Sequence, residues 1–587
     1  DFQNNYYEYE LPMVMSDPNA VLGFQSQDSP YKQEVWKKEN EFNFPLEILR
    51  QLKEERNSLN IQKSEIYSKT IQAEESNAMH EIRVKGSPSL GYAKVMVIGI
   101  RNPEDDGASY DSEVWINELR LAGLDERGGA AALARMDIQL ADLGNLTLAG
   151  NVSTIGFGAL DNQVHERNRE QVTGYDVAAN LELGKFFPDK LGLRLPFYGQ
   201  ISNTTTTPEY DPYDTDIKLK DKLDRAESKT VRDSLRNQSQ EVVNIRTYNF
   251  TNVRKERTGN NPNRKPMPWD IENFSVSYSN SKTERRDPLV EFERQDDWTA
   301  ALDYSFSIPA KPIEPFKKIK SKYLRLVKEF NFNPLPQSFT FSTVFDRQFS
   351  TTRYRFTGLD DRFNTFFNKR FFWDRNYSLN WDFTKSLKFN YDAAVTASID
   401  EPDENFMLET LPADQINKFR RDSIWNNIRD LGRPKLYNHR FSINYTLPIR
   451  YLPYMDWVQV RANYQGEYRW EAASLNVDSL GNIISNSQNR TLNADLNFEK
   501  LYNSIPYLRK IERASKGTSN RGRSGRTPTP RDRNANKDDD KNKRKRNKDV
   551  SPIETALVRP LLLLRKGRFS YSERFRTVVP GFTPVAN

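Results

Sequence analysis

Apolar and polar residues alternate along the stretch Tyr377–Ile399, and this alternation constrains the fold more than any other feature of the chain. Nearly every odd position is apolar, whereas the even positions are mostly Ser, Asn, Asp, Thr or Lys. Because successive side chains of a strand point to opposite faces, the pattern predicts two strands joined through Lys385 and Ser386. A β-sandwich could show the same alternation. However, each run covers about ten residues, the length that a tilted strand needs to cross a bilayer.

The same period recurs along most of the chain, for example in Trp298–Ile308 and Val458–Trp470. Between Ala134 and Phe582 about fourteen segments follow it, and an array of this kind is typical of an outer-membrane β-barrel. The sequence therefore predicts an all-β fold, in which an antiparallel transmembrane β-barrel portion of about fourteen strands follows a small β-rich module.

If the apolar faces of these strands meet lipid, the polar faces line an aqueous lumen. The residues predicted to face the lumen are Asn380, Asp382, Asn390, Asp392, Gln459, Arg461, Asn463 and Gln465. Those predicted to face lipid are Tyr377, Leu379, Trp381, Phe383, Leu387, Phe389, Tyr391, Val395, Val458 and Val460. The mixed charge of the first set indicates a wet surface without strong ion selectivity, and the simplest alternative is that these side chains are merely solvated.

The composition agrees with a barrel and disfavours several other classes of protein. The chain has no run of eighteen apolar residues, and its sharpest apolar cluster, Leu561–Leu564, is too short to span a bilayer as a helix. Its 27 Tyr, 34 Phe and 9 Trp include many near predicted strand ends, where such residues form interfacial girdles. The absence of cysteine excludes disulfides, thiolate metal sites and cysteine nucleophiles.

No motif indicates an enzyme, a cofactor or a metal site. Gly517–Ser524 resembles a phosphate-binding loop, but Arg523 stands where a lysine is required, and neither a strand nor a helix flanks it. Acidic residues cluster in 104–113 and in 209–216 without the spacing of a calcium loop, so both clusters are expected to be solvated turns. The three histidines, His80, His165 and His439, lie far apart in the sequence and match no catalytic motif.

Four parts are expected along the chain. Residues 1–130 form a soluble β-rich module, with strands at Ala93–Ile100 and Val114–Leu121 and a short helix within Pro45–Gln62. Residues 131–512 supply barrel strands, 513–552 a basic disordered insertion, and 553–587 a further strand. The chain begins at Asp1 without a signal peptide and stops in mid-pattern, so we expect a piece of a longer protein.

Connection lengths suggest an orientation for the barrel, because such proteins have short periplasmic turns and long external loops. Short and long connections alternate, except that two long ones, 310–337 and 502–566, fall on the short side. The net charge is +7, but residues 509–549 hold sixteen Lys or Arg against six Asp or Glu. This run has no interleaved aromatic residue, so proximity to anionic lipid headgroups is favoured over binding to nucleic acid.

Several unusual strings resemble one family. They are VWINELRL (Val114–Leu121), ADLGNLTLAGNVSTIGFG (Ala141–Gly158), YDVAANLELGKFFPDKLGLRLPFYGQIS (Tyr175–Ser202) and FSYSERF (Phe569–Phe575), the last followed by PGF. In this order they closely resemble the SprA/Sov family, the outer-membrane translocon of the type 9 secretion system. The resemblance covers the whole chain and is most specific over residues 110–215.

The resemblance implies a function that the residues alone do not. The family forms a very large single-chain barrel, in the class of about 36 strands, that passes folded proteins from the periplasm to the cell surface in gliding and pathogenic bacteria. It implies outer-membrane lipid, secreted cargo proteins, a PorV-type shuttle at a lateral opening and a periplasmic plug protein as partners. It carries over no catalytic residue and no cofactor. Members of the family are much longer than this chain, which would form only part of the wall.

Two other functions remain open at this point. The strands could close a self-contained porin-like barrel or plugged receptor for small solutes, in which case the first strand near Ala134 pairs with the last near Ser570. Alternatively, the apolar faces could be buried between sheets in a soluble β-rich surface scaffold or adhesin.

Overall fold

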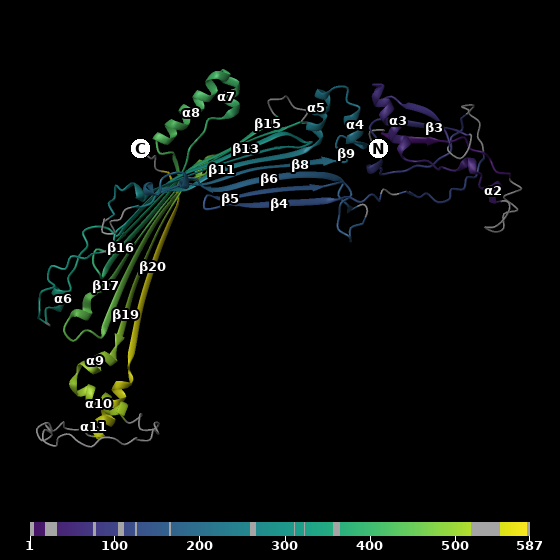
Figure 1. Cartoon of the computed structure of the whole chain (residues 1–587). Helices are drawn as coiled ribbons and strands as arrows, with labels where there is room; N and C mark the ends of the chain where they lie inside the picture. Colours follow the sequence, from purple (N-terminus) through teal and green to yellow (C-terminus); the bar gives the residue numbers. More distant parts are fainter. Residues whose placement is uncertain are drawn as a thin grey trace, which may run out of the picture.

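One large antiparallel sheet dominates the computed structural model of the chain (Figure 1). The structure describes residues 5–17, 32–73, 78–103, 111–123, 126–163, 166–258, 266–309, 311–321, 323–355, 364–517 and 552–583. In this described part, no helix is both long and apolar enough to cross a membrane. The insertion predicted at 513–552 lies mostly outside the described residues, as do residues 104–110 of the first acidic cluster.

The sheet is a meander in which nearly every strand pairs with its neighbours in the sequence. Its strands are β4 Ala131–Leu140, β5 Gly144–Ser153, β6 Glu170–Glu182, β8 Pro196–Pro208, β11 Glu241–Lys255, β12 Phe274–Arg286, β13 Val290–Ser307, β14 Ser338–Tyr354, β15 Thr365–Trp381, β16 Leu387–Ser398, β17 Arg433–Leu447, β18 Val458–Glu471, β19 Asn482–Asn497 and β20 Lys566–Phe582, with the two-residue β7 Leu193–Arg194 paired to β11. The predicted all-β class and the predicted array of about fourteen antiparallel strands are confirmed.

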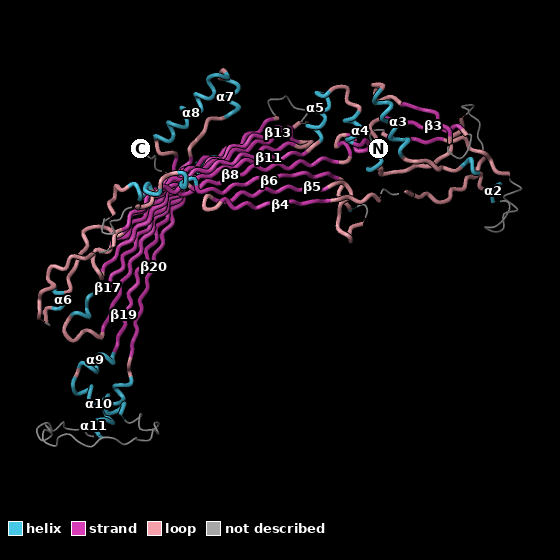
Figure 2. Tube along the Cα trace, viewed as in Figure 1, coloured by secondary structure: helices cyan, strands magenta, loops and turns pink. Residues whose placement is uncertain are grey.

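The sheet is twisted and open. In Figure 2, β4 to β6 lie across the view whereas β19 and β20 run steeply down it, as the accumulated twist between neighbouring strands requires. Among the described residues, β4 pairs only with β5 and β20 only with β19. The two edge strands therefore do not close the sheet on each other.

The connections lie at two ends of the sheet. End A carries 141–143, 183–195, 256–273, 308–337, 382–386, 448–457 and 498–565, whereas end B carries 154–169, 209–240, 287–289, 355–364, 399–432 and 472–481. The two long connections predicted on the short side are indeed at end A. In addition, the tight turn 287–289 falls among the longer connections of end B.

Two predicted strands are wrong. Ala93–Ile100 and Val114–Leu121 belong to no strand in the described part of the chain, and their side chains are exposed, Val97 by 84%. The physical reason is that extended backbone becomes a strand only when another strand accepts its hydrogen bonds, and none lies beside either segment here.

The N-terminal module combines a small sheet with the helix α3 Glu47–Ser58 and the one-turn helix α2 Lys32–Val35. Its strands β1 Tyr6–Glu10, β2 Tyr67–Gln72 and β3 Met79–Lys85 pair in the order β1-β3-β2. The helix α3 lies within the predicted segment Pro45–Gln62 and packs on this sheet. The core that they share consists of Leu49, Leu52, Ile82 and Val84.

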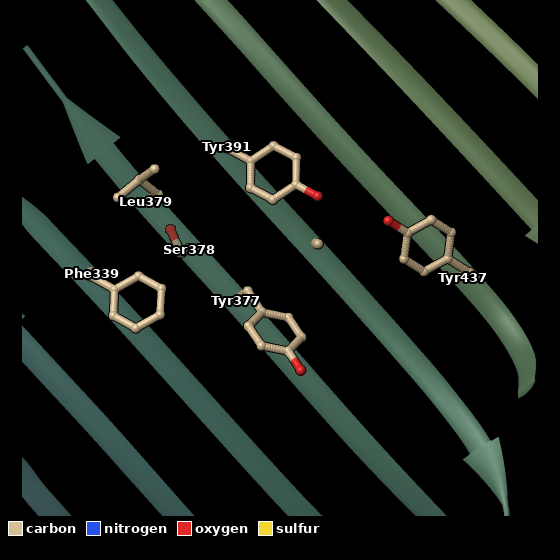
Figure 3. A pocket seen from close by; sticks show the side chains of 7 residues that line it. Phe339, Tyr377, Ser378, Leu379, Tyr391 and Tyr437 are labelled. Carbon is tan, nitrogen blue, oxygen red and sulfur yellow. The ribbon is translucent and has the colours of Figure 1, made fainter. Parts of the chain in front are cut away.

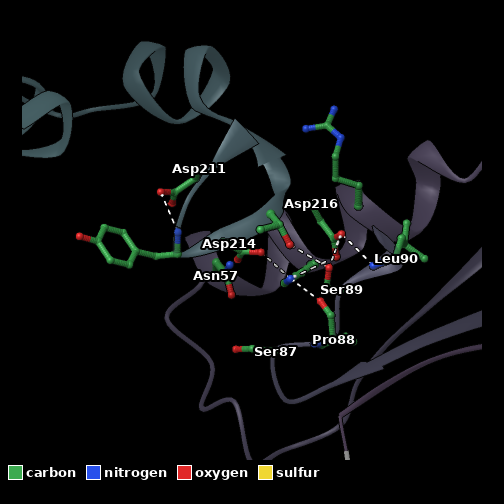
Figure 4. A network of polar contacts seen from close by, with 12 residues as sticks. Asn57, Ser87, Pro88, Ser89, Leu90, Asp211, Asp214 and Asp216 are labelled. Atoms are coloured by element: carbon green, nitrogen blue, oxygen red, sulfur yellow. Dashed lines mark hydrogen bonds and ion pairs between the residues drawn. The ribbon is translucent and has the colours of Figure 1, made fainter. Parts of the chain in front are cut away.

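A buried lysine fastens this module to the β8–β11 connection at end B (Figure 4). Lys53 is 1% exposed, and its Nζ lies 2.5 Å from Asp214 Oδ1, 3.3 Å from Asp216 Oδ2 and 2.6 Å from the carbonyl oxygen of Pro88. The amide of Leu90 donates to Asp216 Oδ1 at 2.8 Å. Since buried charges are stable only when paired and hydrogen-bonded, these contacts hold the module in one position.

The acidic cluster 209–216 is therefore not a solvated turn, and that prediction is wrong. Glu209, Asp211 and Asp216 are all under 9% exposed. Asp211 pairs with Lys222, and Glu209 with Arg169 at 3.2 Å. The carboxylates are buried because basic side chains, several of them distant in the sequence, neutralise them. The connection also contains β9 Tyr210–Asp211, β10 Asp214–Lys218, α4 Leu219–Asp224 and α5 Lys229–Ser239.

Replacing Lys53 is expected to release the module. The variant Lys53→Met leaves Asp214 and Asp216 without their buried counter-ion, which costs about 3–5 kcal/mol when one partner of a buried pair is removed. Hydrogen exchange of the Leu90 amide and of β10 should accelerate strongly in the full chain. The matched variant Lys69→Met removes only an exposed pair with Glu55 and should change little. Equal protection in the two variants would contradict this account of the docking.

The module is also expected to loosen in acid. His80 is 2% exposed, its Nδ1 lies 2.7 Å from the Tyr9 hydroxyl, and burial lowers its pKa. The folded module therefore binds fewer protons than the unfolded chain. The contribution of neutral His80 is present above the unfolded pKa of about 6.5 and is lost as pH falls through the folded pKa. Exchange in β3, corrected for its intrinsic pH dependence, should rise between pH 7 and pH 5, and less so in His80→Gln. An identical rise in that variant would exclude His80 as the cause.

Candidate functional site: a two-faced wall

The strand register places the predicted polar residues on one face of the sheet. Directly opposite residues of an antiparallel pair share a face. Asn380 lies opposite Asn390, Asn390 opposite Ser442, and Ser442 opposite Gln465. One row of polar side chains therefore crosses four consecutive strands.

Neighbouring rows bring the other predicted lumen residues onto this same polar face. These rows are Ser378–Asp392–Arg440–Glu467, Asn444–Asn463–Thr491, Thr446–Arg461–Asn493 and Gln459–Asp495–Arg568. Asp382 follows the last residue of β15 and pairs with Lys388 at 3.3 Å. The structure thus gathers the whole set on or beside one face, and their exposure to a lumen stays a prediction.

Small hydrogen-bonding side chains and balanced ion pairs make up the polar face. Ser279 donates to Asn249 at 2.6 Å, and Ser570 to Asn493 at 2.8 Å. Ion pairs join opposite charges along the rows, namely Arg440–Glu467 at 3.4 Å, Arg461–Asp495 at 3.2 Å and Arg568–Asp495 at 2.9 Å. Because both signs are interspersed, this face presents water-compatible groups without a strong field of either sign.

The predicted lipid-facing residues share the opposite face. Tyr377 lies opposite Ala393, Leu379 opposite Tyr391, and Trp381 opposite Phe389. Figure 3 shows Phe339, Leu379, Tyr391 and Tyr437 on neighbouring strands around a shallow hollow of this apolar face. The remaining members follow the same alternation: Leu387 opposite Tyr445, Val395 opposite Tyr437, Val460 opposite Leu447 and Val458 opposite Leu496. Phe383 lies in the β15–β16 turn and stacks on Trp381 at 4.3 Å.

Two rows of aromatic rings border the apolar face, and further ring pairs such as Phe341–Tyr377, at 5.1 Å, lie between them. Near end A the ring contacts are Phe197–Phe250, Phe274–Tyr304, Tyr304–Phe339, Trp381–Phe383 and Trp457–Phe498, at centroid distances of 4.3–5.8 Å. Nearer end B they are Trp298–Phe371, Phe345–Trp373 and Tyr437–Tyr468, at 4.7–6.1 Å. The rows are six residues apart in β13, from Trp298 to Tyr304, and eight to ten apart in β15, from Phe371 and Trp373 to Trp381. These separations are roughly 20–33 Å along a strand at about 3.3 Å per residue.

Sequence reasoning missed what covers the apolar face beyond the second row. There Arg347 makes a bidentate pair with Glu401 at 2.6 and 2.7 Å, and Arg420 reaches Glu404 at 2.6 Å. The helices α7 Glu404–Thr410 and α8 Ala413–Arg429 belong to this cover, in which Met407 is fully buried. The odd positions of β14 and β15 belong to the apolar face, and beyond the aromatic row nearer end B they include basic residues such as Arg347 and Lys369. These basic residues could have indicated from the sequence that the apolar band ends at this row.

The positions of acidic and histidine side chains in the described part of the chain bear on the possibility of a metal site. Among the described residues, no group of three or more His, Cys, Asp or Glu side chains is arranged to hold a metal ion. His80 lies in the N-terminal module and His439 on the apolar face, 5.2 Å from the ring of Tyr468. His165 lies outside the described residues.

Comparison with known proteins supports the resemblance predicted from the motifs. Residues 1–223 match the family model SprA_N, described as a motility related/secretion protein. This match includes the docked N-terminal module, the acidic cluster 209–216 and the first strands of the sheet. No curated protein matches the chain. Over residues 1–223 of its 587 residues, the chain is therefore similar to the SprA_N family of motility- and secretion-related proteins.

Proposed function

We propose that the chain forms part of the wall of a protein-conducting channel in the outer membrane, exporting folded proteins to the cell surface. The observation that supports this most is the division of one continuous sheet into an apolar face bordered by two aromatic rows and a polar face of balanced charge. A transmembrane barrel likewise has an apolar band between aromatic girdles and a polar interior.

The breadth of the sheet favours a wide lumen. Fourteen strands follow one another without closing, and the polar face carries mainly short Ser, Thr and Asn side chains. Barrel diameter grows with strand number, so an arc of this size completed by further strands encloses a large aqueous space. Passage of a folded cargo through such a space needs no covalent chemistry, so we assign no catalytic residue.

The two alternatives fit less well. A self-contained channel for small solutes requires β4 to pair with β20, whereas in the described part each has only one neighbour. A soluble scaffold requires a second layer over the apolar face, and the described cover, α7 and α8, lies beyond the aromatic row nearer end B. The family's description as motility- and secretion-related further favours a protein cargo over a small solute.

The same proposal includes the partners that the resemblance implies. Secreted cargo proteins pass through the lumen, a PorV-type shuttle collects them at a lateral opening, and a plug protein closes the periplasmic end. We place end A in the periplasm on the alternation of connection lengths predicted from the sequence. The turns 141–143 and 382–386 at end A follow that alternation, whereas 308–337 and 498–565 at end A and 287–289 at end B depart from it. The docked module then lies on the outer side with the β8–β11 connection.

Single cysteines across β16 test the wall. The chain has no cysteine of its own, so each variant carries one thiol. In intact cells, Asn390→Cys and Asp392→Cys should react with a water-soluble maleimide, whereas Phe389→Cys and Tyr391→Cys should stay protected because lipid covers them. Protection without alternation, or reaction at all four positions, would refute the membrane wall and favour the soluble scaffold.

A pair of arginine substitutions tests the same faces energetically. Tyr391→Arg places a charge on the apolar face between the aromatic rows, at a cost of about 2–4 kcal/mol near the bilayer midplane. Asn390→Arg places the same side chain on the polar face, one residue away, and serves as the matched control. The fraction of protein that resists urea extraction from membranes should fall for Tyr391→Arg only. Equal losses would mean that the two faces do not differ in their surroundings.

A further inference from the structure

The β13–β14 connection, residues 308–337, is built onto the neighbouring turn at end A. Asn331 and Asn333 are each 7% exposed. The Asn333 amide nitrogen Nδ2 donates to the carbonyl oxygen of Asp382 at 2.7 Å, and the backbone amide of Lys385 donates to Asn331 Oδ1 at 2.7 Å. An isolated bridge between Ile313 and Phe332 closes the base of the connection. These contacts give its inner side a defined position.

The side of this connection that faces away from the β15–β16 turn exposes apolar residues, and no protein segment in the described part covers them. Large side chains that are 40–75% exposed are Ile313, Phe316, Tyr323, Leu324, Leu326, Val327, Phe330, Phe332 and Leu335. Such a concentration within 23 residues is unusual for a surface in water and indicates an interaction surface. Because the inner side is anchored, the exposed side is available for a ligand.

The same segment is strongly basic. Between residues 311 and 329 it contains Lys311, Lys317, Lys318, Lys320, Lys322, Arg325 and Lys328, against Glu314 and Glu329. Glu314 is already neutralised by Lys385 and by Lys317. Within the described residues, Lys318, Lys320 and Lys328 have no acidic partner. Lysines among exposed aromatic and aliphatic side chains match anionic headgroups lying next to acyl chains.

The segment is also continuous with the aromatic row near end A. The indole nitrogen of Trp381 donates to the carbonyl oxygen of Asn333 at 3.1 Å. The backbone amide of Asn333 donates to the carbonyl oxygen of Phe383 at 2.8 Å. Arg325 lies 5.6 Å from the ring of Tyr451 in the next end-A connection. If the apolar face lies in a bilayer, this segment lies at the level of its headgroups.

We propose that residues 311–330 bind the anionic phospholipids of the leaflet at end A, with the lysines on phosphate groups and the apolar side chains between headgroups and acyl chains. This proposal rests on the membrane wall proposed above and adds a ligand to it. Each lysine near an anionic surface contributes about fivefold in binding, so several together select strongly for anionic over zwitterionic lipid. A protein partner at the same surface is the competing outcome.

A fluorescent label at one residue tests the proposal in the full chain reconstituted into lipid nanodiscs. Leu326→Cys carries an environment-sensitive dye, and the quencher is a lipid spin-labelled near its headgroup. Nanodiscs contain phosphatidylcholine alone or an equal mixture with phosphatidylglycerol. Quenching should be at least about twofold stronger in the mixture, because the lysines draw the segment onto anionic lipid. A second label, on Val460→Cys, tests whether the apolar face of the sheet contacts lipid. Its quencher is a lipid that is spin-labelled deep in the acyl chain.

Two matched charge variants separate lipid recognition from general charge. Lys317→Gln, Lys318→Gln, Lys320→Gln and Lys328→Gln together should abolish the effect of phosphatidylglycerol. The control removes the same charge from four exposed lysines away from end A, by Lys94→Gln, Lys220→Gln, Lys229→Gln and Lys418→Gln, and should keep the effect.

Three results would overturn the proposal in different ways. An unquenched label at residue 326 beside a quenched one at 460 would place the segment in water, where a protein partner would cover it. Quenching at residue 326 that does not depend on lipid charge would mean that the segment inserts into the bilayer without selecting anionic lipid. An unquenched label at 460 would refute the membrane wall itself, and this proposal with it.

Discussion

The backbone hydrogen-bond ladder between neighbouring antiparallel strands is the constraint on which the rest of this structure depends. Side chains alternate with a period of two, so a slip of one residue between two strands would move every side chain of one strand to the other face. The observed register avoids this along most of each ladder and shifts only locally, in the β11–β12, β13–β14, β16–β17 and β19–β20 pairs. It keeps Asn390 in line with Ser442 and Gln465, and Tyr391 in line with Phe441. One face is therefore polar and the other apolar over the width of the sheet.

The two ends of this wall are covered by different means. At end B, other segments of the chain cover the sheet and its connections. The carboxylates of Asp214 and Asp216 pair with Lys53, and Glu401 pairs with Arg347. Buried charges of this kind hold a single arrangement because either partner alone is costly to bury. At end A, the connections leave aromatic, aliphatic and basic side chains exposed beside a row of rings. A lipid leaflet satisfies such a surface, whereas water does not.

The two edge strands of the sheet, β4 and β20, each have one unpaired side in the described part of the chain. An unpaired edge strand exposes backbone donors and acceptors and tends to recruit other strands. β4 and β20 are both in this state in the described part, and apolar side chains along them, such as Leu133 and Phe569, are more than half exposed. A channel wall built as an arc needs further strands at both edges, in keeping with the large barrel that the resemblance implies.

Alternation within single segments was enough to predict the strands, their number, and the two faces around Tyr377–Ile399, because side-chain direction along a strand is a local property. Pairing over long distances was not predictable in this way. Residue 53 meets residues 214 and 216 only through the fold, and a run of acidic residues looks the same whether water or a lysine will neutralise it. Likewise, Ala93–Ile100 has the composition of a strand but lacks a partner strand in this structure. The sequence by itself thus determined which side chains share a face. Only the tertiary structure decided which segments pair, which charges are buried, and which apolar surface is left exposed, because each of these depends on groups distant in the chain.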